Sequence, residues 1–184
     1  MAVEEPSYKL EMHEGAHEVR AYPPLIAAET TVSGDRGAAV NAGFRLLAAY
    51  IFGGNVQGQS IAMTAPVVQA HERAGRIAGP LTASGKSGTW IVQFIMPAGR
   101  TLETLPAPKD SRVRLRLLSP ARLAVARFSG LTTDGDLQRE TAALEAFMAR
   151  HGLHAAGAPA LARYDPPWTP WFLRRNEIWI PISP

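Results

Sequence analysis

The segment Glu18–Gly34, with the sequence EVRAYPPLIAAETTVSG, decides the fold because its pattern recurs 96 positions later. The second copy, Arg114–Gly130, reads RLRLLSPARLAVARFSG and shares an arginine, a proline, an alanine and a terminal Ser-Gly pair with the first. Each copy predicts a strand, a proline-containing turn and a second strand that ends at the Ser-Gly pair. A repeat of this kind indicates two structurally similar halves within one chain.

A helix is expected after each copy. Apolar residues at helical spacing predict one helix from about Ala38 to Phe52 and another from about Asp136 to His151. Each helix is followed by glycine, Gly53-Gly54 in the first case and Gly152 in the second, which can adopt the left-handed conformation of a C-terminal cap. Thr133-Asp134 supplies candidate N-cap residues for the second helix.

The strands that follow the helices complete the repeated order. Each half closes on an apolar strand that ends in proline, Ile91–Pro97 in the first half and Ile178–Pro181 in the second. The predicted order is therefore ββαββ twice, joined by a proline-rich linker at 106–108.

This order favours a single α+β domain over residues 1–184, with repeat halves at about 15–97 and 110–182. We expect a pseudo-twofold-repeated distorted antiparallel β-barrel flanked by two α-helices, because neither half alone has enough residues for a core of its own. Residues 71–88, rich in glycine, serine and charge, predict a mobile hairpin loop.

Composition excludes several classes of protein. The 184 residues include no cysteine, which excludes a disulfide framework, a Cys-ligated zinc site, an iron–sulfur cluster and a thiol nucleophile. Lysine and arginine number 19 against 16 acidic residues, and no long run of like charges suggests a nucleic-acid-binding tail. No apolar run reaches the roughly 18 residues of a membrane span, and residues 1–15 do not resemble a signal peptide, so we expect a cytoplasmic protein.

The two predicted helices differ in their apolar surfaces. The second has a single apolar face, formed by Leu137, Leu144, Phe147 and Met148. The first has a wider apolar surface, formed by Val40, Phe44, Leu47, Ala48 and Ile51 and extended by Leu46 and Tyr50. Its only charge between residues 38 and 52 is Arg45. A helix that is apolar nearly all round must be covered on most sides, by a loop, a second subunit or a ligand.

Several motifs resemble those of the SOUL/haem-binding-protein family. They are Glu18-Val19-Arg20 with Tyr22, the run from Gly43 to Asn55, the segment Ile61–Val67 (IAMTAPV), and Tyr164–Pro167 (YDPP) with Arg174–Trp179 (RRNEIW). The resemblance covers roughly residues 8–182 in order, and the combination of MTAPV with RRNEIW is specific. It implies a distorted β-barrel with two helices and an internal twofold repeat, similar also to the gyrase-inhibitor-like effector-binding fold. It further implies binding of haem or another tetrapyrrole in a surface groove beside the first helix.

The resemblance also assigns residues to that groove. One wall is expected from the first helix, through Val40, Phe44, Leu47, Ala48 and Ile51. The opposite wall is expected from the loop 168–173, where Trp168, Trp171 and Phe172 could stack on a porphyrin or, alternatively, cap the end of the barrel. Arg45 and Arg174 are candidate cations for the two propionates of haem.

The residues that bind haem in some family members are missing here. Some members carry a histidine immediately before the tyrosine of the first motif, where this chain has Ala21, and no histidine of this chain lies in a family motif. Basic residues of haem-binding relatives fall on Asn41, Ala49 and Thr169, which are neutral. We therefore expect haem to be held without a strong axial protein ligand.

Glu177 is the main candidate for a polar group inside the barrel, because strand alternation puts it on one face with Trp179. No catalytic motif is found, so an enzyme is disfavoured. The leading hypothesis is a tetrapyrrole-binding carrier, buffer or sensor. The alternatives are an effector-binding module for an apolar or cationic small molecule and a hydrolase on the same scaffold. Neither nucleic acid nor a membrane is expected as a partner, and oligomerisation through the first helix stays open.

Overall fold

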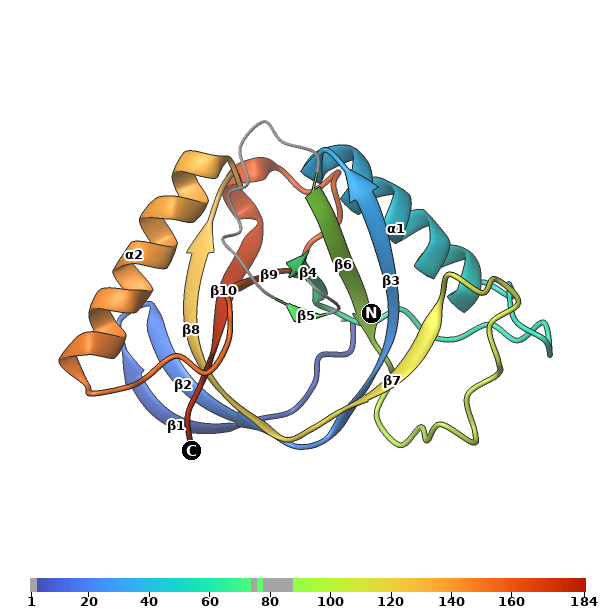
Figure 1. Ribbon diagram of the computed structural model, residues 1–184, viewed down its shortest axis with the longest axis horizontal. Coiled ribbons are helices and arrows are strands. Elements are labelled where there is room, and N and C mark those ends of the chain that lie inside the picture. The colour runs from blue at the N-terminus through green and yellow to red at the C-terminus, as the bar shows by residue number, and fades with distance from the viewer. Residues whose placement is uncertain (1–2, 74–75, 78–87) are drawn as a thin grey trace.

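In the computed structural model, which describes residues 3–73, 76–77 and 88–184, one antiparallel sheet joins both halves of the chain (Figure 1). Its strands are β1 (Lys9–Glu14), β2 (His17–Tyr22), β3 (Leu25–Gly34), β4 (Val67–Arg73), β5 (Arg76–Ile77), β6 (Gly88–Ile95), β7 (Arg114–Leu118), β8 (Ala121–Ser129), β9 (Ala160–Arg163) and β10 (Arg175–Ile182). The helices are α1 (Arg36–Ile51) and α2 (Asp134–Arg150), and a short 3-10 helix, η1, spans Trp171–Leu173.

The order of the strands places equivalent elements of the two halves in equivalent positions. The order is β1-β2-β8-β10-β9-β4-β6-β3-β7, with β5 paired to β4. The β4–β9 pair lies between the halves, and β7-β3-β6-β4 on one side corresponds to β2-β8-β10-β9 on the other. The strands joined by each proline turn belong to different halves of the sheet, because β2 pairs with β8 and β3 pairs with β7. The turns at Pro23-Pro24 and Ser119-Pro120 therefore hold the two halves together.

The sheet is curved like a barrel, but it does not close. In the described part of the chain, the edge strands β1 and β7 do not pair with each other. The α+β class and the distorted barrel-like sheet are confirmed, with an open sheet in place of a closed barrel. Figure 1 shows a helix on each outer side of the sheet, with α1 along β3 and β6 and α2 along β8 and β10. We call the side that carries the helices the outer face and the opposite side the inner face.

The glycines after both helices and the Thr133 cap of α2 were predicted from the sequence, whereas the Asp35 cap of α1 was not. Asp35 caps α1, since its Oδ2 accepts hydrogen bonds from the backbone nitrogens of Gly37 and Ala38 at 3.1 and 3.3 Å. Thr133 and Asp136 form a capping box at the start of α2. Gly53 and Gly152 follow the two helices with φ of 106° and 65°, a conformation that side chains disfavour. Each helix begins slightly earlier than predicted and ends close to the predicted residue.

The apolar face of α2 packs on the sheet as expected. Leu137, Leu144 and Phe147 are fully buried, in contact with a cluster that includes Val19 and Ile178. The proline-rich linker is packed as well, because the hydroxyl of Tyr50 on α1 donates to the carbonyl oxygen of Pro106 at 2.8 Å. Neither helix within the described ranges is long and apolar enough to cross a membrane.

The loop predicted at 71–88 is shorter in the structure. Residues 71–73 continue β4, because they pair with β6 or β5, and Gly88 already begins β6. The rest of the predicted loop, at 74–75 and 78–87, lies outside the described residues.

Candidate functional site

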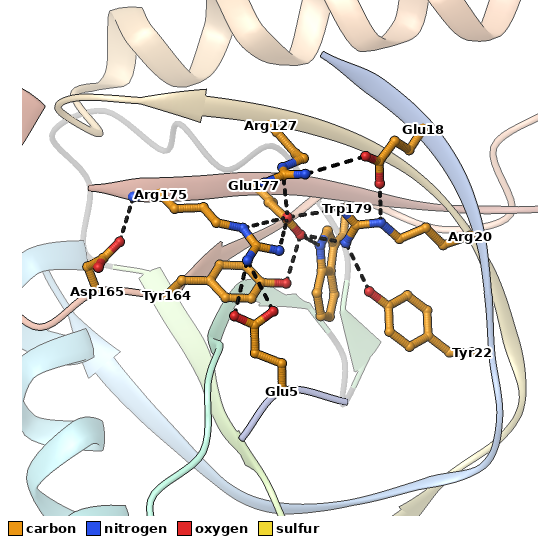
Figure 2. A network of polar contacts seen from close by, with 10 residues as sticks. All are labelled: Glu5, Glu18, Arg20, Tyr22, Arg127, Tyr164, Asp165, Arg175, Glu177 and Trp179. Atoms are coloured by element: carbon orange, nitrogen blue, oxygen red, sulfur yellow. Dashed lines mark hydrogen bonds and ion pairs between the residues drawn. The ribbon is translucent and has the colours of Figure 1, made fainter. Parts of the chain in front are cut away.

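A fully buried carboxylate, Glu177, lies at the centre of the inner face (Figure 2). It is on β10, and the guanidinium of Arg20 on β2 donates two hydrogen bonds to it, from Nη1 to Oε2 at 2.8 Å and from Nη2 to Oε1 at 3.0 Å. Neither side chain has any exposed surface. The two residues lie 157 positions apart in the chain, and each strand pairs with β8 between them. Glu177 and Trp179 share one face as alternation predicts, and this face is the inner one.

Three further side chains donate to the same carboxylate. The Tyr164 hydroxyl and the Trp179 indole nitrogen each lie 2.8 Å from Oε2, and Nη2 of Arg175 lies 2.8 Å from Oε1. Arg127 adds an ion pair at 3.7 Å. Both carboxylate oxygens are therefore fully used by groups of the protein itself.

The partners of Glu177 are held by a second set of contacts. Nε of Arg20 donates to Glu18 at 2.6 Å, and its Nη1 donates to the Tyr22 hydroxyl at 3.1 Å. Arg175 stacks on the ring of Tyr164 at 3.8 Å and forms an ion pair with Glu5 at 3.1 Å. Figure 2 shows these residues as one connected network.

The electrostatics of the network favour an ionised Glu177 and neutral tyrosines. Burial by itself raises the pKa of Glu177, but hydrogen bonds and charge from Arg20 outweigh burial, so the pKa lies below its usual value. Burial raises the pKa of Tyr22 to about 12 and also raises the pKa of Tyr164. The carboxylate is thus ionised and balanced by arginine at neutral pH, and both tyrosines are neutral.

The first helix does not present the predicted apolar wall. Val40, Leu47 and Ile51 are buried against residues of the sheet and the linker, such as Phe94 and Leu105, and Leu47 has no exposed surface at all. These three side chains do not line an open groove, contrary to the expectation, because α1 uses this face to cover β3 and β6. The width of the apolar surface is explained by protein packing on more than one side.

Three predicted residues of α1 remain at or near the surface. Phe44 is 36% exposed, and its ring contacts Phe94 edge-on with 5.3 Å between centroids. Arg45 is exposed and donates only to the carbonyl oxygen of Asn41, at 3.4 Å, in the described structure. Ala48 is half-buried beside them.

The loop before β10 presents apolar side chains to solvent. Trp168 is 82% exposed, and Trp171, Phe172 and Leu173 are all more than half exposed. The rings of Trp171 and Phe172 meet edge-on at 5.7 Å. These side chains do not cap the end of the barrel, which was the alternative. Exposed apolar patches of this kind are uncommon on monomeric proteins, so this loop is a candidate surface for interaction.

Arginines lie next to this loop. Arg174 is bound to the loop itself, since Nε donates to the Thr169 carbonyl oxygen at 2.8 Å and Nη2 donates to that of Pro167. Arg163, on the outer face of β9, is half-buried, and no hydrogen bond or ion pair of its side chain is found within the described ranges. Burial, followed by the charges of Arg174 and Arg36, lowers the pKa of Arg163.

We call the set Arg163, Trp168, Trp171, Phe172, Leu173 and Arg174 the outer site. Its aromatic members and Arg174 were predicted from the sequence. Arg163 was missed. The only sequence signal for it is that it lies two residues after Leu161 on the same strand, and therefore on the same face of the sheet as that buried leucine. Among the described residues, Arg174 and Arg36 repel the charge of Arg163, so a negatively charged ligand would lower the electrostatic energy of this surface.

A family model described as SOUL heme-binding protein matches residues 3–181 of this sequence. The chain belongs to the SOUL heme-binding protein family. Among SOUL relatives, Heme-binding protein 2 of Homo sapiens is 28% identical over 185 residues, which cover 97% of this chain and 86% of the human protein.

Solved structures resemble this SOUL chain at lower identity. The crystal structure of the EcmrR C-terminal domain has a TM-score of 0.65 at 10% identity, covering 96% of this chain and 98% of that domain. A crystal structure of a hydrolase from Listeria innocua has a TM-score of 0.63 at 18% identity, covering 91% of each chain. At these identities the likeness shows the fold alone.

Three of the five histidines of this SOUL chain contact other side chains of the protein. His17 stacks on Phe147 with centroids 5.2 Å apart, and His151 contacts Glu14 at 2.8 Å. His71 contacts Trp90 edge-on at 5.0 Å. The described residues contain no group of three or more His, Asp or Glu that could hold a metal ion. The residues of the outer site fit the ring and the carboxylates of haem, but they include no imidazole for its iron.

Proposed function

We propose that this SOUL-family chain binds haem or a related tetrapyrrole at the outer site. The observation that carries the proposal is the exposed aromatic loop beside half-buried Arg163, which has no anionic partner in the described structure. A tetrapyrrole with propionates combines a large apolar ring with two carboxylates, and the outer site combines the complementary groups.

The apolar part of the site would contact the face of the macrocycle. Trp168 and Trp171 present indole rings that can stack on a porphyrin, and burying them would remove exposed apolar surface from water. The binding energy would therefore come mainly from apolar burial, at about 25 cal/mol per Å² before ordering costs are subtracted. Phe44 and Arg45 are the parts of α1 that stay accessible to an extended ligand.

The arginines would bind the propionates. Arg163 and Arg174 have like charges that interact, and a carboxylate between them would form charge-assisted hydrogen bonds with the guanidinium of Arg163, which no described residue pairs. This contact would give the site a preference for anionic tetrapyrroles over neutral ones. The expected cation Arg45 is too weakly held to orient a propionate by itself, because it contacts only the helix backbone.

We further propose binding without a histidine axial ligand and without catalysis. The absence of an imidazole in the outer site supports the first point. The second is supported by the state of Glu177, whose oxygens all accept hydrogen bonds from the protein, so this carboxylate is not free to act as an acid or a base. A carrier or a buffer for haem is consistent with both. The effector-module alternative for a cationic ligand is not favoured, because Arg20 already occupies the place of the cation.

The proposal is tested by titrating the full chain with hemin and following the Soret band. We expect saturation near a 1:1 ratio and a spectrum without the features of histidine ligation. The double variant Trp168→Ala/Trp171→Ala should bind hemin at least tenfold more weakly. Leu117→Ala is the matched control, because Leu117 is similarly exposed but lies on β7. Unchanged affinity in the double variant, or equal losses in the two variants, would reject the outer site.

A further inference from the structure

The inner face contains a cavity that the proposed function does not use. It has a volume of about 250 Å³ and lies between the two halves of the sheet, near the two proline turns. Fifteen of the described residues line it, among them Tyr22, Leu25, Val68, Ile95, Leu123 and Trp179. Most of these side chains are apolar, so the cavity offers a water molecule few hydrogen-bond partners and suits an apolar ligand.

Small residues create the space. Ala121, Gly157, Ala158 and Ala160 face it from β8, from the segment before β9 and from β9 itself, and none of them has a side chain long enough to fill it. The deep wall is rigid, because Val68, Ile95 and Trp179 are buried. Pro23 and Ser119, in the two turns, are exposed and mark the entrance.

The aromatic residues of the cavity present ring surfaces to a guest. The rings of Tyr22 and Trp179 lie 5.5 Å apart at an angle of 40°. Their polar atoms are already engaged in the network around Glu177, since the Tyr22 hydroxyl accepts from Arg20 and the Trp179 indole donates to Glu177. The rings are therefore available for contact with another aromatic system, while their polar ends are not.

The charges near the cavity are compensated within the protein. Glu177 is paired with Arg20, and Glu29, which contacts the lining residue Gln93, is paired with Arg116 at 3.4 Å. No charged side chain is among the fifteen described lining residues. A charged guest would lose its hydration without gaining a counter-ion, which is strongly unfavourable in an apolar cavity. The cavity therefore selects against both cations and anions.

Inside the exposed entrance at Ser119, the side-chain amide of Gln93 can orient a guest. Nε2 of Gln93 donates to Glu29 at 2.7 Å, whereas Oε1 of the same amide accepts no hydrogen bond from any described residue. An oxygen with this environment can accept one hydrogen bond from a hydroxyl or an N–H group of a ligand.

We propose that this cavity is a second ligand site, which takes an uncharged aromatic molecule of about two fused rings with one hydrogen-bond donor. The size follows from the volume, because an apolar cavity of about 150 Å³ accepts a single benzene ring. A tetrapyrrole is too large and too charged for this cavity, so the site is separate from the outer site and goes beyond the proposed function.

Three probes of similar size and different charge test the proposal: 1-naphthol, 1-naphthoate and 1-naphthylmethylammonium. Calorimetric titration of the full chain at pH 7 should show saturable 1:1 binding of 1-naphthol and at least tenfold weaker binding of the two ions. Absence of naphthol binding, or equal affinity for either ion, would overturn the proposal.

Two variants locate the site. Ala121→Leu places a larger side chain in the cavity and should weaken 1-naphthol binding at least tenfold, whereas Ala143→Leu, at an exposed position of α2, should leave it unchanged. Ser119→Trp at the exposed entrance is a second obstructing variant, in case Ala121→Leu unfolds the chain. Unchanged naphthol affinity in a folded obstructing variant would overturn the proposal.

Competition separates this site from the outer site. Hemin titration of the obstructing variants should match that of the original chain, and saturating 1-naphthol should not change hemin affinity. Failure of hemin binding with naphthol binding intact would reject only the proposed function. Mutual displacement of hemin and 1-naphthol would reject the second site.

Discussion

Arg20 and Glu177 form a two-pronged ion pair in which neither side chain reaches solvent, with N–O distances of 2.8 and 3.0 Å. Such a pair is costly to break from one side, because the remaining charge stays buried without its partner. The pair also joins β2 and β10, which lie on either side of β8. The ion pair can therefore form only when β2 and β10 are both in their correct register with β8.

Glu177→Gln should lower the free energy of unfolding by about 3–5 kcal/mol, because the variant removes the carboxylate that receives two hydrogen bonds from Arg20 and leaves this buried arginine with Glu18 as its remaining acidic partner among the described residues. Urea unfolding followed by circular dichroism measures the change. The double variant Arg20→Met/Glu177→Gln is the control, and it should be more stable than Glu177→Gln alone. If adding Arg20→Met destabilises the chain further, the loss is not due to the missing partner of Arg20.

The stabilisation from Glu177 should depend on pH in a defined direction. Burial raises the pKa of this carboxyl, but hydrogen bonds from Arg20 and charge lower it more, so its folded pKa lies below the ordinary value of 4.5. The ionised form is therefore favoured by folding, and the contribution is complete above pH 4.5 and is lost as the pH falls through the folded pKa. The difference in unfolding free energy between the original chain and Glu177→Gln should shrink below pH 4.5. A difference that stays constant from pH 7 to pH 3 would contradict this assignment.

The sequence predicts the elements of this fold well because they depend on local signals. The proline turns, the Ser-Gly strand ends and the glycines after both helices each act within a few residues, and each is found where it was expected. The pairing of β2 with β8 could not be predicted in this way, because it joins strands from different halves of the chain and has no local signal. Glu177 could be assigned to the inner face by alternation, but its partner Arg20 could not be identified by spacing.

The candidate site was predicted less well, for a physical reason that α1 illustrates. Hydrophobic periodicity shows which residues of a helix are apolar, but it does not show which neighbour covers them. Here the sheet and the linker around Leu105 cover Leu47, and a ligand was expected in their place. The exposed loop from Trp168 to Leu173 was recognised because it has more apolar residues than a loop needs for its own folding.

Leu47→Ala should destabilise the chain by about 2–5 kcal/mol, because a fully buried leucine is removed from a packed core. Phe44→Ala should cost clearly less, since the Phe44 ring is 36% exposed. Guanidinium denaturation of both variants gives the comparison. Equal losses would mean that the two side chains are covered to a similar extent, in conflict with the packing of α1 described above.

Arg163 provides the contrast to Arg20, because it is a half-buried arginine that no described residue pairs. Burial and the charges of Arg174 and Arg36 disfavour its charged form, so Arg163→Met should leave the melting temperature unchanged or raise it in a buffer without multivalent anions. If Arg163 does not stabilise the fold, ligand binding is the better explanation for a half-buried arginine at this position. Added phosphate, at constant ionic strength, should stabilise the original chain more than Arg163→Met, because a ligand that binds only the folded state raises its stability. Arg112→Met is the control, since Arg112 is exposed and already paired with Asp110 at 2.6 Å. If Arg163→Met lowers the melting temperature as strongly as an Arg20 variant does, Arg163 is a structural residue and the outer site loses its anion-binding group.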